Sequence, residues 1–187
     1  MNISAVLLAG GESRRMGSDK ATLAWRGRPL WEWQIEKLRA LQPETIFVSA
    51  RFDVMWRPAD AELILDAPPS RGPLSGLVAT LARTKTDHLL ILAVDMPFMT
   101  VERLRVMCEA AAEGVGAISV IDGRAEPLGA IYPKESLPVL TEALESNNFS
   151  LQPVVQRLID LNMLRVLPLA PGAGELYRSV NERRDLV

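Results

Sequence analysis

Short apolar runs and helical stripes alternate along the first hundred residues of the chain. Ile3 to Leu8 is an apolar run that stops at Gly10-Gly11, a pattern typical of a buried strand that meets a tight turn. From Pro29 to Leu41 the apolar residues fall at helical spacing instead, and proline suits a first helical position. A second helical stripe, from Leu74 to Leu81, follows Gly72-Pro73. Three more apolar runs predict strands at Ile46 to Ala50, Leu63 to Leu65 and His88 to Val94.

The second half of the chain continues the alternation less regularly. Thr100 is predicted to cap a helix that extends to about Glu113. Further patterns predict strands and helices at Gly116 to Ile121, Leu128 to Tyr132, Leu137 to Leu144 and Val154 to Ile159. Alternating strands and helices with short connections favour an α/β three-layer sandwich, in which a Rossmann-like, mainly parallel sheet carries helices on both faces. No linker divides the chain, so residues 1–187 are predicted to form one domain.

Composition and charge exclude several classes of partner. With 48% hydrophobic and 24% charged residues, the chain is ordinary globular protein. Its formal net charge of -2 cannot attract nucleic acid or an anionic membrane, so neither is an expected partner. Cys108 is the only cysteine, which favours a reducing, cytoplasmic location. The N-terminal residues lack the pattern of a signal peptide, and no apolar stretch approaches the roughly 20 residues of a membrane span.

The residues that follow the predicted strands are the candidates for chemistry. Ligands of open parallel sheets bind at the carboxyl ends of the strands. Here Gly10-Gly11, Asp66 and Asp95 each follow a predicted strand, so all three are expected along one edge. Mg²⁺ takes one or two carboxylates together with substrate phosphates, and Asp95 is the better candidate ligand. In the alternative interpretation Asp95 caps the next helix and Asp66, before two prolines, caps a turn.

The glycine-rich turn matches neither common phosphate-binding fingerprint. It lacks the G-x-G-x-x-G spacing, and Ser18-Asp19 separates Gly17 from Lys20 where a P-loop would have them adjacent. Adjacent glycines nevertheless let backbone N–H groups approach a phosphate, and Arg14, Arg15 and Lys20 can neutralise its charge. A flexible surface turn with incidental basic residues would have the same composition.

Two other reactive side chains are weaker candidates. His88, the only histidine, lies at the opposite end of its predicted strand from Asp95, which argues against a histidine-based mechanism. Cys108 belongs to an apolar-rich helix and is predicted to be a buried thiol.

Several motifs in order carry a family resemblance. The run from Leu8 to Lys20, followed by Gly27-Arg-Pro-Leu30, Gly72-Pro-Leu-Ser-Gly-Leu77 and Asp95-Met-Pro97, closely resembles molybdenum cofactor guanylyltransferases of the MobA-like nucleotidyltransferase family. The resemblance covers about the first hundred residues and is weaker beyond them. It implies a sheet of the nucleotide-diphospho-sugar transferase type, with a nucleotide-binding part over about 1–100 and an acceptor-binding part over about 101–187.

The resemblance also implies a reaction. GMP would pass from GTP to the terminal phosphate of molybdopterin or molybdenum-molybdopterin, and pyrophosphate would be released. Proteins that insert or receive the cofactor would be further partners. The pterin phosphate is already a nucleophile at neutral pH, so positioning and charge neutralisation suffice.

Residue roles follow by position from the same resemblance. Lys20 and Arg15 would neutralise the triphosphate, Asp66 would contact the nucleotide, and Asp95 would hold Mg²⁺. Backbone contacts to guanine would come from Leu8, Ala9, Gly10 and Gly11. The chain departs from the family at Ser49, where asparagine is usual, and in Ser179-Val-Asn-Glu-Arg183, which keeps only Asn181 of an Asn-x-Asn-Thr-Pro signature. Ser49 is thus a candidate nucleotide contact, and Asn181 a candidate near the metal or the acceptor.

Three alternatives remain open. Cytidylyltransferase relatives tend to have Leu-Ala-Ala-Gly at positions 8–11, and the missing methyl group at Gly10 leaves room for a larger purine, which favours GTP. Sugar-phosphate nucleotidyltransferases share the fold but have a longer glycine-rich pattern. A nucleotide-binding accessory or carrier protein without turnover would not require both Lys20 and Asp95.

Overall fold

The computed structural model describes residues 2–10, 19–66, 69–146, 149–170, 172–180 and 185. Their strands form an eight-stranded sheet in the order β10-β7-β9-β6-β1-β4-β5, with β8 beside β7, and a separate hairpin of β2 and β3. The strands are β1 (Ile3–Leu8), β2 (Ala24–Trp25), β3 (Arg28–Pro29), β4 (Ile46–Ala50), β5 (Ala61–Leu65), β6 (His88–Ala93), β7 (Gly116–Ile121), β8 (Arg124–Ala125), β9 (Gly129–Pro133) and β10 (Leu164–Leu167).

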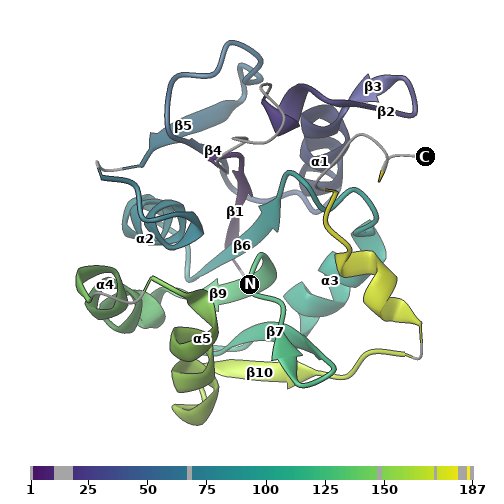
Figure 1. Cartoon of the computed structure of the whole chain (residues 1–187). Coiled ribbons are helices and arrows are strands. Elements are labelled where there is room, and N and C mark those ends of the chain that lie inside the picture. Colours follow the sequence, from purple (N-terminus) through teal and green to yellow (C-terminus); the bar gives the residue numbers. More distant parts are fainter. Residues whose placement is uncertain are drawn as a thin grey trace.

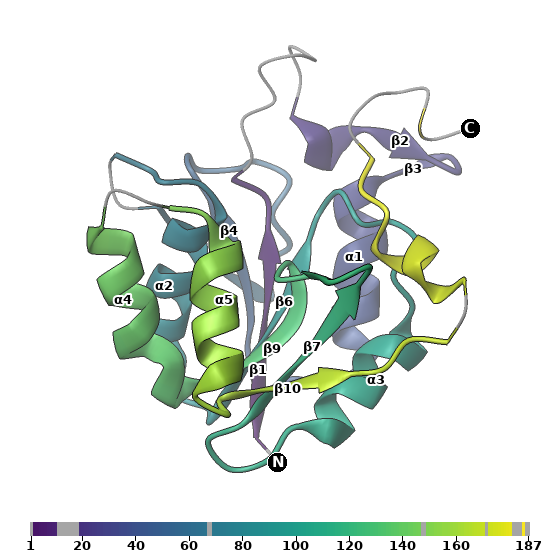
Figure 2. The same cartoon turned by 60° about the horizontal axis from the view of Figure 1, so that its bottom comes forward.

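Helices cover both faces of the sheet. Helices α2, α4 and α5 lie on one face, and α1 and α3 lie on the other (Figures 1 and 2). This arrangement confirms the predicted three-layer α/β sandwich. The helices are η1 (Lys20–Thr22), α1 (Leu30–Arg39), α2 (Pro73–Arg83), α3 (Val101–Ala110), η2 (Lys134–Ser136), α4 (Leu137–Glu145), α5 (Leu151–Asp160) and η3 (Ala173–Tyr177). No helix in these described ranges is long and apolar enough to cross a membrane.

The sheet is mainly parallel, with one reversed strand in its main path. β1 pairs in parallel with β4 and β6, β4 with β5, and β10 with β7. β9 lies between β6 and β7 and is antiparallel to both. Its apolar run predicted a strand but carried no information about its direction. The reversal brings the end of β7 and the start of β9 to the same edge of the sheet.

The strand register places the candidate residues together. Leu8, the last residue of β1, is opposite both Ser49 of β4 and Ala93 of β6. Ala50 is opposite Leu65, and the backbone N–H of Asp66 then donates to the carbonyl of Ala50. The segments that carry Gly10, Asp66 and Asp95 therefore leave the sheet at one edge, as the sequence predicted.

Burial on both faces explains the continuous apolar runs. All residues of β1 are buried, and its side chains alternate between two apolar clusters. Ala5 and Leu7 belong to the cluster that includes α1 and α3. Val6 and Leu8 belong to the cluster that includes α2, α4 and α5. A strand with a core on each side has no polar face to interrupt its pattern.

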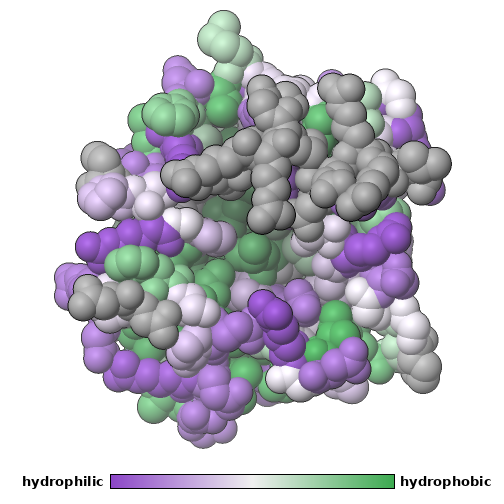
Figure 3. Space-filling view, in the orientation of Figure 1, coloured by the Kyte–Doolittle hydropathy of each residue, from purple (hydrophilic) through white to green (hydrophobic). Residues whose placement is uncertain are grey.

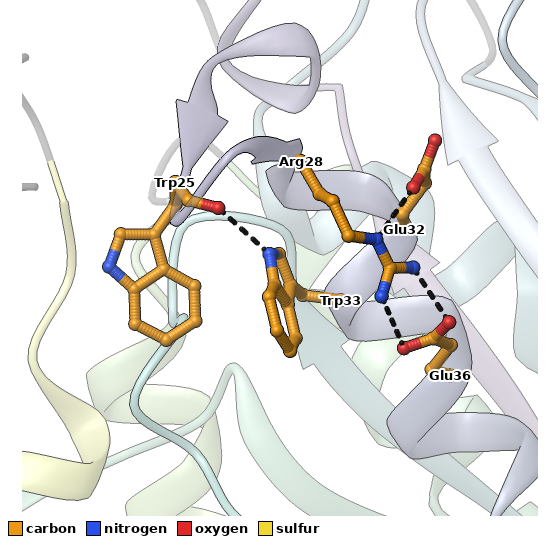
Figure 4. A network of polar contacts seen from close by, with 5 residues as sticks. All are labelled: Trp25, Arg28, Glu32, Trp33 and Glu36. Carbon is orange, nitrogen blue, oxygen red and sulfur yellow. Dashed lines mark hydrogen bonds and ion pairs between the residues drawn. The ribbon is translucent and has the colours of Figure 1, made fainter.

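The hairpin of β2 and β3 was not predicted, because strands of two residues are too short to show alternation. Arg26 and Gly27 both have positive φ, 49° and 80°, which is the geometry of a tight two-residue hairpin turn. The hairpin is attached to α1, since the indole N–H of Trp33 donates to the Trp25 carbonyl at 2.9 Å. Arg28 lies over the Trp33 ring and binds the carboxylates of Glu32 and Glu36 (Figure 4).

Candidate active site

A cleft opens at the carboxyl edge of the parallel strands. Its empty space amounts to about 580 Å³ when the open solvent at its mouth is included. The space-filling view shows a hollow with hydrophobic side chains on its floor in the middle of this face (Figure 3). The cleft is lined by Leu8, Ala9, Gly10, Lys20, Ser49, Asp66, Gly72, Pro73, Gly76, Ala93, Val94, Asp95 and Leu128.

Lys20 and Asp95 form an ion pair in this cleft. Nζ of Lys20 lies 3.1 Å from Oδ2 of Asp95, and the two side chains are 19% and 21% exposed. Lys20 is the first residue of η1, whose N-cap Asp19 accepts from the Ala21 N–H at 3.0 Å. The other oxygen of Asp19 accepts from the indole N–H of Trp56 at 2.8 Å. The backbone at Lys20 is therefore held in place, and the ammonium group of Lys20 faces the carboxylate of Asp95, shortly after β6.

Asp66 is buried deeper in the same cleft. Its Oδ1 accepts from the Ser49 hydroxyl at 3.2 Å, and its Oδ2 accepts from the Ser70 hydroxyl at 2.8 Å. The start of α2 at Gly72 and Pro73 lines the cleft beside it. Two hydroxyl donors therefore hold this carboxylate at a fixed orientation, and Ser49 both lines the cleft and donates to Asp66.

Two glycines leave room for this arrangement. A methyl group at Gly76 would lie 2.4 Å from Oγ of Ser49, closer than non-bonded atoms approach, and 3.4 Å from Oδ1 of Asp66. A methyl group at Gly10 would lie 3.3 Å from Oδ2 of Asp66. The first contact of a side chain at position 10 would therefore be the Asp66 carboxylate. The hypothesis that Gly10 leaves room for a purine remains a prediction.

Replacement of Gly76 by alanine should destabilise the protein, although the same change usually stabilises a helix by about 1 kcal/mol. The new methyl group would displace Ser49 and Asp66, so we expect a loss of about 1–3 kcal/mol in the free energy of unfolding, measured with urea. The Ser49→Ala, Gly76→Ala double variant should recover part of this loss, because it removes the clashing hydroxyl. A double variant no more stable than Gly76→Ala would contradict the steric explanation.

Most predicted site residues come together, and some lie outside the described residues. Leu8, Ala9, Gly10, Lys20, Ser49, Asp66 and Asp95 all line the cleft. Gly11, Arg14, Arg15 and Asn181 lie outside the described ranges, and their roles remain predictions.

The two residues judged weaker candidates lie away from the cleft. His88 pairs with Ile3 at the start of β1, and its Nε2 is 2.9 Å from the carbonyl of Ala112. Cys108 is partly rather than fully buried, and burial raises the pKa of its thiol to about 11.

Sequence reasoning missed two polar residues beneath the cleft, Gln34 and Lys37 of α1. Gln34 is fully buried, and Lys37 donates to its side-chain oxygen at 2.8 Å. A signal for Gln34 was present, because it occupies a core-facing position of the α1 stripe beside Ile35 and Leu38. A polar residue at such a position requires buried hydrogen-bond partners.

Burial lowers the pKa of Lys37 from its ordinary value of 10.5 to about 8. The unfolded chain therefore binds more protons between these values, and the contribution of Lys37 to stability should rise as the pH increases from about 8 to 10.5. Relative to Lys37→Met, the wild-type protein should gain on the order of 2 kcal/mol between pH 7 and pH 10, measured by urea unfolding. The raised pKa of Cys108 should make stability fall as the pH increases. Because both proteins contain Cys108, this contribution cancels in the difference between them. A difference that stays flat with pH would contradict the lowered pKa.

The sequence and the fold of the chain are matched by known proteins. Residues 5–161 match the family described as MobA-like NTP transferase domain. The chain belongs to this family of nucleotidyltransferases. A probable molybdenum cofactor guanylyltransferase from Opitutus terrae is 34% identical over 185 residues, covering 97% of this chain and 91% of the relative. A molybdenum cofactor guanylyltransferase from Pseudomonas putida is 32% identical over 157 residues, covering 82% of each.

Solved structures share the fold of this MobA-like domain. The molybdopterin-guanine dinucleotide biosynthesis protein A of Archaeoglobus fulgidus has a TM-score of 0.75 at 23% identity, covering 98% of this chain and 94% of that one. The 2-C-methyl-D-erythritol 4-phosphate cytidylyltransferase of Thermus thermophilus has a TM-score of 0.68 at 16% identity, covering 97% and 94%. Because proteins named for guanine and for cytidine chemistry share this fold, the fold alone does not determine the base.

Proposed function

We propose that this protein transfers GMP from GTP to the terminal phosphate of molybdopterin, with or without bound molybdenum, and forms the guanine dinucleotide cofactor. One observation carries the proposal: the Lys20–Asp95 pair faces the cleft beside Asp66 in a MobA-like NTP transferase domain. Relatives above 30% identity named as molybdenum cofactor guanylyltransferases support the choice of base and acceptor.

The reaction is a displacement at the α-phosphorus of GTP. An oxygen of the acceptor phosphate forms a bond to that phosphorus, and the bond from the phosphorus to the oxygen that bridges it to the β-phosphate breaks. Pyrophosphate leaves with the electron pair of the broken bond. The attacking oxygen is already negatively charged, so the protein needs to align the reactants and to neutralise charge rather than to remove a proton.

The cleft provides these two effects. Backbone groups of Leu8 to Gly10 and the Asp66 carboxylate would hold the nucleotide, and Lys20 would leave Asp95 to neutralise the triphosphate. The nucleotide would occupy the half formed by about residues 1–100, and the acceptor the half formed by about 101–187. As the cysteine content suggests, we place the reaction in the cytoplasm.

Asp95 fits the requirements of a magnesium ligand. No group of three or more acidic, histidine or cysteine side chains suited to a metal occurs in the part of the chain that the structure describes. Mg²⁺ bound through substrate phosphates needs only one or two carboxylates, and Asp95 lies in the cleft where those phosphates would be. The ion would supply further neutralisation of the triphosphate, and its partner carboxylate would be Asp95.

Nucleotide selectivity tests the proposal. Purified protein with Mg²⁺ and molybdopterin should release pyrophosphate from GTP and not from CTP, ATP or UTP, as measured by a coupled pyrophosphate assay. The acceptor is withheld in the control, and release should then stop. Turnover of CTP instead of GTP would show that the proposed base is wrong. Nucleotide binding without turnover would favour an accessory or carrier protein.

A further inference from the structure

Gln34 contacts the backbone on both sides of Asp95. Its side-chain nitrogen donates to the carbonyl of Met96 at 2.8 Å and to that of Ala93 at 3.1 Å, with the Val94 carbonyl 3.5 Å away. The side chain has no exposed surface. A buried amide is tolerated only when its polar atoms are paired, and these partners all belong to the segment that carries Asp95.

Lys37 extends the same contact by one helical turn. Its Nζ donates to Oε1 of Gln34 at 2.8 Å and to the carbonyl of Pro97 at 2.7 Å. No carboxylate of the residues that the structure describes lies within ion-pair distance of Lys37, so its hydrogen-bond partners are uncharged oxygens. The ammonium group is partly buried, and its two acceptors are neutral oxygens. Both contacts lead to the segment that carries Asp95, one directly at Pro97 and the other through Gln34.

The backbone of the Asp95 segment is fixed from further directions. The N–H of Val94 donates to the Leu8 carbonyl at 3.0 Å, and the N–H of Val180 donates to the carbonyl of Asp95 itself at 2.7 Å. Gln34 and Lys37 approach from α1 and donate to backbone carbonyls on either side of Asp95. These contacts together hold the backbone from which the Asp95 side chain extends to Lys20.

We propose that Gln34 and Lys37 are positioning residues, which hold the Ala93–Pro97 segment so that the Asp95 carboxylate can bind a magnesium–nucleotide complex. The inference rests on the proposed function in that Asp95 is taken as the magnesium ligand. Gln34 and Lys37 of α1 would thus support, from behind, a site whose other residues follow the ends of strands. Partners of metal ligands typically contribute tenfold to a hundredfold to metal affinity or activity.

The test compares nucleotide affinity with and without metal. Gln34→Met keeps the length of the side chain and removes its donor, and Lys37→Met removes the ammonium group at the next turn while it keeps most of the apolar stem. The matched control is Thr86→Val, at the opposite end of β6, where a buried hydroxyl donates to the backbone carbonyl of His88 at 2.9 Å. Calorimetric titration with GTP in Mg²⁺ or in EDTA gives the ratio of the two affinities, and thermal unfolding reports stability.

We expect the ratio to fall roughly tenfold in Gln34→Met and by a smaller factor in Lys37→Met, with affinity in EDTA unchanged. Thr86→Val should lower the melting temperature and keep the wild-type ratio. An unchanged ratio in Gln34→Met, or an equal fall in Thr86→Val, would show a purely structural role. If the wild-type protein binds CTP rather than GTP, the proposed base is wrong, and the same ratio measured with CTP still tests the positioning role.

Discussion

Replacement of Asp95 by asparagine should lower the rate of pyrophosphate release from GTP by at least about 10²-fold. Asparagine has the shape of aspartate, so the cleft should keep its form while the charge that binds Mg²⁺ is lost. The remaining Lys20 would still attract the triphosphate, so GTP affinity in EDTA should stay the same or increase. The measurement is kcat and KM for GTP, together with GTP binding in EDTA.

Asp60→Asn is the matched control for this variant. Asp60 also forms an ion pair, with Arg39 at 2.6 Å, but it lies on the surface and outside the cleft. Its replacement should leave kcat and KM within about twofold of the wild type, because exposed pairs contribute little. If Asp95→Asn retained the wild-type rate, Asp95 could not be the metal ligand.

Replacement of Lys20 by methionine should raise the KM for GTP and lower kcat, with a combined loss in kcat/KM of roughly 10²-fold. Lys20 meets Asp95 in the structure and would transfer its charge to the triphosphate when the nucleotide binds. Its effect should therefore be present both in binding and in the transition state, where charge develops on pyrophosphate. Steady-state kinetics over a range of GTP concentrations separate the two parts.

Lys85→Met controls for the loss of one positive charge. Lys85 is exposed in the connection before β6, at the edge of the sheet opposite the cleft. We expect unchanged kinetics in this variant. In the Lys20→Met, Asp95→Asn double variant the two losses should not add in full, because the two side chains contact each other. Full additivity would mean that the two residues act independently.

The layered fold could be predicted because the central strands are buried on both faces. All residues of β1 and β6 are buried, and short apolar runs that end at glycine or proline are typical of such strands. The direction of β9 could not be predicted, since an apolar run reads the same in either orientation. β2, β3 and β10 are too short for a periodic signal, and the hairpin of β2 and β3 depends on Trp33 and Arg28 of neighbouring segments.

The site was predictable where it follows strand ends and not where it depends on packing. Asp66 and Asp95 could be placed on one edge from the order of strands alone. Gln34 could not be connected to Asp95, because its partners lie about sixty positions away and only the packing of α1 beneath β6 brings them together. Arg15 remains a prediction from the family motif.

The reversed strand β9 gives the cleft two walls of different construction. Ala93 donates to the carbonyl of Leu128, just before β9, so one wall of the cleft is the short connection from β7 through β8. The opposite wall consists of the ends of β1, β4 and β5. Insertions or deletions in the connection would reshape this wall without altering β1, β4 or β5, the strands that precede Gly10 and Asp66. Under the proposed function, such changes would alter the binding of the acceptor and leave the contacts to the nucleotide in place.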